Sequence, residues 1–255
     1  MIHLITLQKM TCLSTIRRVL QWMFWTISIA LVVLLFASWV ISIYVDGVEG
    51  LLTPHGIRWM CSSIVSNFTS VPLAQIILGL MALSVLRESG IFLTLRGHVS
   101  LKQKRALQIT GVFVLIILCL FSLLLLLPNA VLLSAFGTYS HSAFSKGMYG
   151  LMACLAIFVG NVYGYTSGKL VSTLDFLRAH TAIFSTVANC FIFLFLASQF
   201  VGCLHFTGIL TLLGDSDGIG LFVLKVLLYG VPLLLYVVLA FLQNAFNPHF
   251  SHSGR

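Results

Sequence analysis

Six long apolar runs, separated by short connections, constrain the fold of this chain more than any other feature of its sequence. A helix that crosses the hydrocarbon core of a bilayer needs about 20 consecutive apolar residues, and only the second and the last run fall clearly short of that length. We therefore predict an all-α, polytopic integral membrane helix bundle with about six transmembrane helices. The runs are Trp22–Tyr44, Val71–Leu86, Ala106–Leu127, Met148–Thr166, Thr181–Leu204 and Gly230–Leu242.

The composition of the chain excludes a soluble domain. Of the 255 residues, 59% are hydrophobic and only 8% are charged, whereas soluble domains carry about 25% charged residues. No hydrophilic stretch is long enough to form a second domain. We expect a basic cytoplasmic tail at residues 1–20, a transmembrane domain at 21–245 and a C-terminal tail at 246–255.

The positive charge lies mostly on alternate connections. If the N-terminus is cytoplasmic, eleven of the fourteen Lys and Arg residues lie on the inner side, in agreement with the positive-inside rule. We expect an integral protein of the bacterial inner (cytoplasmic) membrane with both termini in the cytoplasm. We then expect the basic residues, which give a formal net charge of +8, to contact the lipid bilayer and not nucleic acid. The three basic residues expected outside are Arg58, Lys146 and Lys225.

Motifs of enzymes and metal sites are absent from the sequence. There is no H-E-x-x-H, G-x-S-x-G or phosphate-binding loop, and the six acidic residues lie at the ends of apolar runs or between them. The six cysteines form no C-x-x-C pair, so neither a disulfide framework nor a zinc site is indicated. We expect a protein that is not an enzyme and that binds no metal and no cofactor.

Three stretches between or within the runs are informative. The stretch from Pro54 to Phe68 has apolar positions at helical spacing, which predicts a short helix in the outer interface of the membrane. Residues 208–220 are apolar but interrupted by glycines, so they form either two interfacial helices or one broken helix. The last transmembrane helix should begin near Val231-Pro232, and the run at 106–127 should face lipid.

Polar side chains inside apolar runs are the default candidates for a membrane site. An uncharged amide in a helix bundle more often makes one interhelical hydrogen bond than a ligand contact, and both roles remain open here. A separate formal pattern, the glycosylation sequon Asn67-Phe68-Thr69, carries little weight. The candidates for substrate binding are Asn161, Tyr163, Gln199 and Asn244.

Glycines crowd the fourth run and its end. Gly160, Gly164 and Gly168 recur every four residues, which places them on one face of a helix. Small residues let two helix backbones approach closely in lipid. We therefore expect these three glycines to serve helix packing and the fourth helix to be the most buried one.

Four strings occur in a fixed order along the chain. They read I-R-W…N-F…P-L…E-S-G, Y-G-x-x-x-G-K leading to an Asp, A-S-Q-F, and G-V-P-L-L leading to an Asn. The matched positions are Ile57–Gly90, Tyr163–Asp175, Ala197–Phe200 and Gly230–Asn244. Together these strings resemble the p-aminobenzoyl-glutamate transporter family (AbgT).

The resemblance implies a transporter that moves p-aminobenzoyl-glutamate or a related anionic or aromatic compound across the membrane. It also implies a homodimer or a second transporter subunit as partner. The chain is shorter than members of that family, and nothing in it matches their two re-entrant hairpins, so none of their substrate residues is carried over. The alternative is a non-transporting membrane scaffold or subunit derived from such a transporter.

Overall fold

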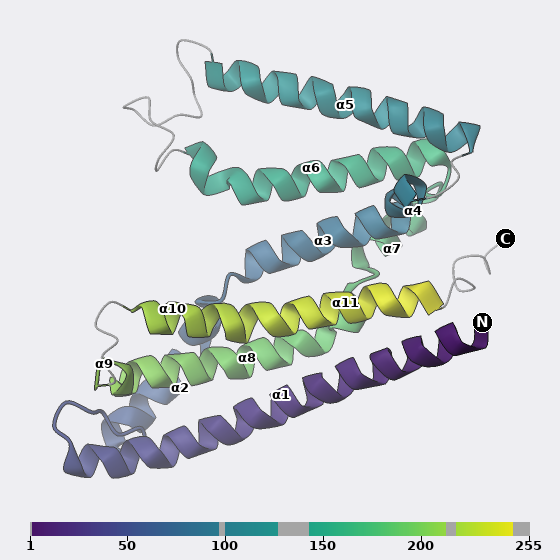
Figure 1. Ribbon diagram of the computed structural model, residues 1–255. Coiled ribbons are helices and arrows are strands. Elements are labelled where there is room, and N and C mark those ends of the chain that lie inside the picture. Colours follow the sequence, from purple (N-terminus) through teal and green to yellow (C-terminus); the bar gives the residue numbers. More distant parts are fainter. Residues whose placement is uncertain (1, 97–99, 127–142, 213–217, 247–255) are drawn as a thin grey trace. The chain divides into compact units, whose positions relative to one another are not determined.

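The computed structural model describes residues 2–96, 100–126, 143–212 and 218–246, and this part of the chain is helical without strands (Figure 1). Within it, six segments are long and apolar enough to cross a membrane, which confirms the polytopic all-α architecture. They are Leu13–Tyr44, Pro54–Ser89, Leu101–Leu123, Gly147–Ser167, Thr173–Thr207 and Ile219–Gln243. The helices are α1 Ile2–Tyr44, α2 Pro54–Thr69, α3 Leu73–Ser89, α4 Ile91–Arg96, α5 Leu101–Leu126, α6 Ala143–Ser167, α7 Thr173–Thr181, α8 Phe184–Thr207, α9 Ile209–Leu212, α10 Ile219–Lys225 and α11 Val231–Phe246.

Two boundaries differ from those expected. α1 begins at Ile2, so residues 2–20 continue the first transmembrane helix as a helical extension. The last spanning segment begins at Ile219 and not near Val231-Pro232, because a π-helical turn at Val226–Gly230 joins α10 to α11. Proline cannot donate a hydrogen bond to the preceding turn and its ring crowds that turn, and a π-turn is one way in which a helix continues past such a residue.

The chain divides into two compact units. Unit 1 comprises residues 1–72 and 186–255 and therefore contains α1, α2, α9, α10, α11 and nearly all of α8. Unit 2 comprises residues 73–185 and contains α3 to α7. We describe each unit by itself.

In unit 1, α2 packs against α8 through aromatic side chains. Trp59 stacks on Phe206 with ring centroids 4.3 Å apart, and Phe68 meets Phe195 edge to face at 5.4 Å. Residue numbers rise along α2 as they fall along α8, so the two helices are antiparallel over this stretch. These two aromatic pairs, at different points along the helices, fix the register of α2 on α8. The location of α2 in the outer interface of the membrane stays a prediction.

Two further contacts hold unit 1 together at the two ends of α8. The Thr186 hydroxyl near its start donates to Oε1 of Gln243 on α11 at 3.3 Å. Near its other end, the backbone nitrogen of Glu49, just after α1, donates to the Thr207 carbonyl at 3.2 Å. α11 also lies beside α1 (Figure 1). α8 is thus bonded to three neighbouring segments of unit 1.

In unit 2, α3 and α6 lie side by side and run parallel (Figure 1). The Tyr149 hydroxyl at the start of α6 donates to the Gln75 carbonyl at the start of α3, at 3.0 Å. Further along both helices, Gly160 faces Val85. One long helix, α5, lies between α3 and α6 in the sequence and can return the chain across the membrane. This arrangement is consistent with α3 and α6 crossing the membrane in the same direction.

Both α3 and α6 end at a glycine in the left-handed conformation. Gly90 has φ 77° and Gly168 has φ 78°, a region that a side chain disfavours. The Lys169 ammonium lies against Gly90, and the Lys102 ammonium lies against Gly168. Since helix C-termini carry partial negative charge, these lysines stabilise them. The start of α5 therefore meets the end of α6, and basic residues gather at this end of unit 2.

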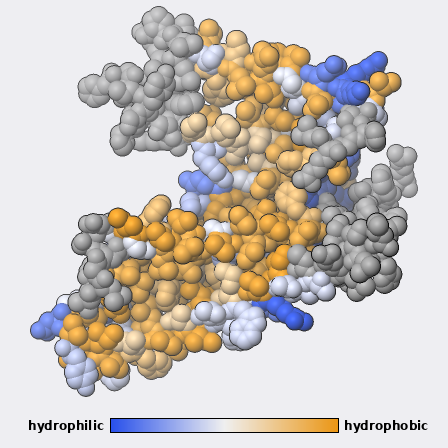
Figure 2. All heavy atoms as spheres, in the orientation of Figure 1, coloured by the Kyte–Doolittle hydropathy of each residue, from blue (hydrophilic) through white to orange (hydrophobic). Residues whose placement is uncertain are grey.

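Apolar side chains cover most of the visible surface (Figure 2). Most side chains of α5 up to Leu123 are exposed, as expected of a helix that faces lipid, although Ala106 and Thr110 are buried. The most buried helix is α8 and not α6, so that expectation was wrong. α8 buries nine residues, among them Phe193 and Leu194, and it contacts both α2 and α11. Among the described side chains of α6, four positions are buried, namely Ala153, Gly160, Tyr163 and Gly164.

Candidate functional site

An amide pair joins α2 to α8 in unit 1. Asn67 donates from Nδ2 to Oε1 of Gln199 at 3.2 Å, and Gln199 donates from Nε2 to the Ile64 carbonyl at 2.9 Å. Both amide side chains are half-buried. An unpaired amide is costly in an apolar environment, so each side chain fixes the orientation of the other. We call Asn67 and Gln199 the amide pair.

Gly202 provides the space for this pair. A Cβ atom at that position would lie 2.5 Å from Cγ and Nδ2 of Asn67 and 2.7 Å from its Oδ1. Such distances are far below van der Waals contact. Gly202 follows Gln199 by nearly one helical turn, so α8 presents its amide and the adjoining space on one side. The absence of a side chain at residue 202 therefore determines where Asn67 can lie.

The amide pair lies beside a break in a spanning segment. The apolar segment Pro54–Ser89 has 36 residues, which as one helix would be about 54 Å long, against a hydrocarbon core of about 30 Å. The helix stops at Thr69 and resumes at Leu73, since Pro72 cannot continue it. Discontinuous helices that expose backbone groups are typical of substrate sites in membrane transporters.

Two of the predicted site residues lie in unit 2. Asn161 on α6 meets His180 on α7, with 3.4 Å between Nδ2 and Nε2. Tyr163 is fully buried, and its hydroxyl is hydrogen-bonded to the Thr94 hydroxyl of α4. The Tyr163 ring packs with Ile91 in a small apolar cluster. Tyr163 thus contributes to the core of unit 2 and offers no free group to a ligand.

The fourth predicted residue, Asn244, lies in the last turns of α11, and its side chain is outside the described part. Its neighbour Gln243 pairs with Thr186. Gln199 lies thirteen residues after Thr186 on α8, which corresponds to about 20 Å at a rise of about 1.5 Å per residue. Asn244 and Gln199 therefore belong to opposite ends of α8, and the four candidates do not form one site within either unit.

The three glycines predicted for packing have different surroundings. A Cβ on Gly160 would lie 2.7 Å from Val85 Cγ1 and 3.1 Å from the backbone nitrogen of Leu86, so α6 approaches α3 closely there. A Cβ on Gly164 would meet the Leu170 side chain at 2.5 Å. Gly168 lies beyond the end of α6 at Ser167 and terminates the helix instead of packing within it.

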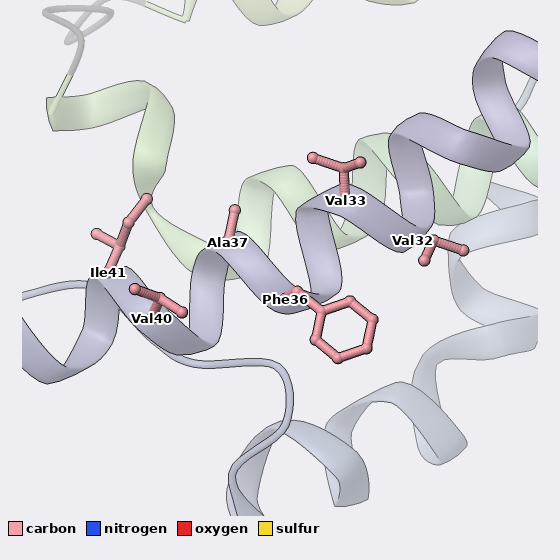
Figure 3. Close-up of a pocket in the computed structure, with 6 residues that line it drawn as sticks. All are labelled: Val32, Val33, Phe36, Ala37, Val40 and Ile41. Carbon is pink, nitrogen blue, oxygen red and sulfur yellow. The ribbon is translucent and has the colours of Figure 1, made fainter.

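A shallow pocket on α1 consists of apolar side chains alone (Figure 3). Figure 3 shows the six residues spread over the surface of one helix, with no polar group among them. Such a surface fits lipid chains and cannot orient a polar substrate. The lining residues are Val32, Val33, Phe36, Ala37, Val40 and Ile41.

Within the described ranges, no group of three or more His, Cys, Asp or Glu side chains is placed to hold a metal ion. The amide pair itself can donate and accept hydrogen bonds without carrying charge.

Asn67 is the site residue that sequence reasoning missed. It appeared within the string from Ile57 to Gly90 and as part of a sequon, but not among the polar candidates. The available signal was an amide on a helical apolar stretch only a few residues before Pro72. Pairing with Gln199 across the fold cannot be read from local sequence.

The fold defines a polytopic α-helical membrane protein in which hydrogen bonds such as Asn67–Gln199 and Thr186–Gln243 join neighbouring helices. The family model for the AbgT putative transporter family matches residues 93–244, which is more than half of the chain. The protein belongs to the AbgT putative transporter family. The match includes the strings from Tyr163 to Asn244, whereas the string Ile57–Gly90 lies wholly before it. Comparisons with curated proteins and with solved structures give no match.

Proposed function

We propose that this membrane transport protein moves p-aminobenzoyl-glutamate or a related anionic or aromatic compound, and that the amide pair contributes to its site. The observation that carries the proposal is the Asn67–Gln199 hydrogen bond beside the break at Ser70–Pro72. An amide pair can exchange its internal bond for bonds to a substrate amide or carboxylate. Membership of a transporter family supports the general activity.

Neutral amides orient an anionic group without neutralising its charge. Binding through the amide pair should therefore be weak, and transport weakly coupled to an ion gradient. The test is flux into vesicles that contain the purified protein, with p-aminobenzoyl-glutamate, p-aminobenzoate and glutamate compared at equal concentration. Preference for p-aminobenzoyl-glutamate supports the proposal, and equal flux of all three compounds contradicts the proposed substrate class.

A second candidate function is that of a non-transporting scaffold or subunit. It is favoured by the bonding of Gln199, whose amide oxygen and nitrogen both already have partners within unit 1. In this role the amide pair only fixes α2 on α8. Absence of flux above protein-free vesicles, together with co-purification of a second transporter subunit, supports this candidate; a homodimer that transports alone contradicts it.

We further propose the bacterial inner membrane as location, with both termini in the cytoplasm. The support is the asymmetric distribution of basic residues, eleven of fourteen on one side. The lysines at the ends of α3 and α6 belong to that inner group. Parallel packing of α3 and α6 agrees with this topology.

A further inference from the structure

A second polar pair, remote in sequence from the amide pair, lies in unit 2. Asn161 near the end of α6 and His180 near the end of α7 approach each other through Nδ2 and Nε2, at 3.4 Å. The other imidazole nitrogen, Nδ1, lies 2.7 Å from the backbone carbonyl of Phe176. The Phe176 ring lies against the imidazole, with centroids 4.3 Å apart. Both nitrogens of His180 therefore have defined partners.

These contacts determine the tautomer of neutral His180. A backbone carbonyl only accepts hydrogen bonds, so Nδ1 must carry the hydrogen that bonds Phe176. Nε2 then has a lone pair and accepts from the Asn161 amide nitrogen. The tautomer with the proton on Nε2 would place two donors, Nε2–H and Asn161 Nδ2–H, opposite each other.

Asn161 has an unused acceptor. Its Oδ1 is buried and has no hydrogen-bond partner among the described residues. Buried carbonyl oxygens without a donor are rare in folded proteins. If His180 takes up a proton, Nε2 becomes a donor, and a half-turn of the Asn161 carboxamide about its last bond presents Oδ1 to it. The same rotation satisfies the unused oxygen.

Several charged groups lie on the elements that pack around His180. α7 packs against α3, where Arg87 and Glu88 form an ion pair at 3.4 Å. On α7 itself, Asp175 accepts from the Ser172 backbone nitrogen at 3.0 Å, and Arg178 is exposed. The remaining titratable groups close to Asn161 in sequence are Tyr163 and Tyr165 on α6 and Lys169 just after it. The Lys169 ammonium lies against Gly90 at the end of α3.

We propose that Asn161 and His180 form a proton-binding site, in which uptake of a proton at His180 Nε2 is accompanied by rotation of the Asn161 carboxamide. Proton uptake forms one N–H bond and breaks no bond of the protein. The proton comes from solvent, and the imidazolium donates it to Asn161 Oδ1 as a charge-assisted hydrogen bond, which is stronger than a neutral one. The site does not depend on the proposed substrate.

The direct test is nitrogen NMR of the full chain with labelled histidine and asparagine in lipid nanodiscs. The sequence contains eight histidines, so the His180 signals are assigned as those absent from His180→Gln. At high pH we expect a protonated Nδ1 and an unprotonated Nε2. At low pH we expect both nitrogens to be protonated and the Asn161 side-chain amide signal to move. A neutral His180 with its proton on Nε2 overturns the proposal.

A thermal measurement tests the role of Asn161 separately. Asn161→Leu removes the acceptor for the imidazolium, so its melting temperature should fall more between pH 8 and pH 5 than that of the wild type. In a His180→Gln background, Asn161→Leu should not change the response to pH. If Asn161→Leu alters the response to pH equally in both backgrounds, Asn161 does not act through His180. If Asn161→Leu does not fold, the NMR test on the wild type decides.

Discussion

Asn67 on α2 donates a hydrogen bond to Gln199 on α8, across 132 residues of sequence. Such a bond between two neutral amides in an apolar helix bundle satisfies groups that lipid cannot satisfy. It also ties α2, which ends at Thr69, to the most buried of the described helices. The first two predictions concern this contact and the space that it needs.

Replacement of Gly202 by alanine should displace the Asn67 side chain. The added Cβ would lie 2.5 Å from Asn67 Cγ, and overpacking of this kind costs about 1–3 kcal/mol. The free energy of unfolding in detergent micelles measures the effect. Gly150→Ala on α6 is the matched control, because a Cβ there meets nothing within 4 Å.

Removal of the Asn67 side chain should relieve the clash, because all three atoms that Gly202→Ala meets belong to that side chain beyond its Cβ. The cost of Gly202→Ala should therefore be smaller in an Asn67→Ala background than in the wild type. A double-mutant cycle measures this difference. Equal costs in both backgrounds would mean that Gly202 does not determine the position of Asn67.

Gly160→Ala should destabilise unit 2. Its Cβ would lie 2.7 Å from Val85 Cγ1 and 3.1 Å from the Leu86 backbone nitrogen, and α3 would have to move away from α6. The expected loss is again about 1–3 kcal/mol in the free energy of unfolding. Gly150→Ala on the same helix serves as control. If the two variants unfold alike, the close approach of α3 and α6 is refuted.

Ser84→Ala should leave a buried backbone nitrogen without a partner. The Ser84 hydroxyl on α3 accepts from the Ile183 nitrogen at 3.2 Å, between α7 and α8. A buried donor left unsatisfied costs about 1–3 kcal/mol. The control is Ser122→Ala on α5, whose hydroxyl donates only within its own helix, to the Cys119 carbonyl. A loss no larger than that of Ser122→Ala would contradict the role of Ser84.

The main helices were predictable from the sequence, because a membrane requires long apolar runs whatever the tertiary packing. The start of the last helix was not, since Pro232 and the glycines before it read as a break. A π-turn at Val226–Gly230 keeps the helix continuous there. Burial was mispredicted because glycine spacing indicates that one face can pack closely, whereas α8 is buried by contacts with several segments that lie far apart in sequence.

The candidate site was predicted in part. Gln199 was selected because it is polar within an apolar run, and that rule would equally have selected Asn67 had α2 been treated as a spanning segment. Tyr163 met the same criterion but is bonded to Thr94 in the core. Which polar residue finds an internal partner depends on tertiary contacts, and the sequence periodicity carries no information about them.

The proposed topology predicts the side from which position 102 is accessible. Lys102 is exposed at the start of α5, and the positive-inside rule places it in the cytoplasm. In a chain with the native cysteines replaced, Lys102→Cys should react with an impermeant thiol reagent only from the cytoplasmic side. Arg58→Cys, exposed on α2, is the control that should react from outside. Labelling of position 102 from outside alone would reverse the topology.

Flux of p-aminobenzoyl-glutamate into vesicles containing the purified protein tests the central claim most directly. We predict flux above that of protein-free vesicles, reduced in Gln199→Ala because a hydrogen bond to substrate is worth about 0.5–1.5 kcal/mol, or roughly a threefold to tenfold change in affinity. Gln21→Ala, an exposed amide on α1, should transport like the wild type. Flux no higher than in protein-free vesicles would contradict transport by this chain, and robust flux unaffected by Gln199→Ala would contradict the proposed site.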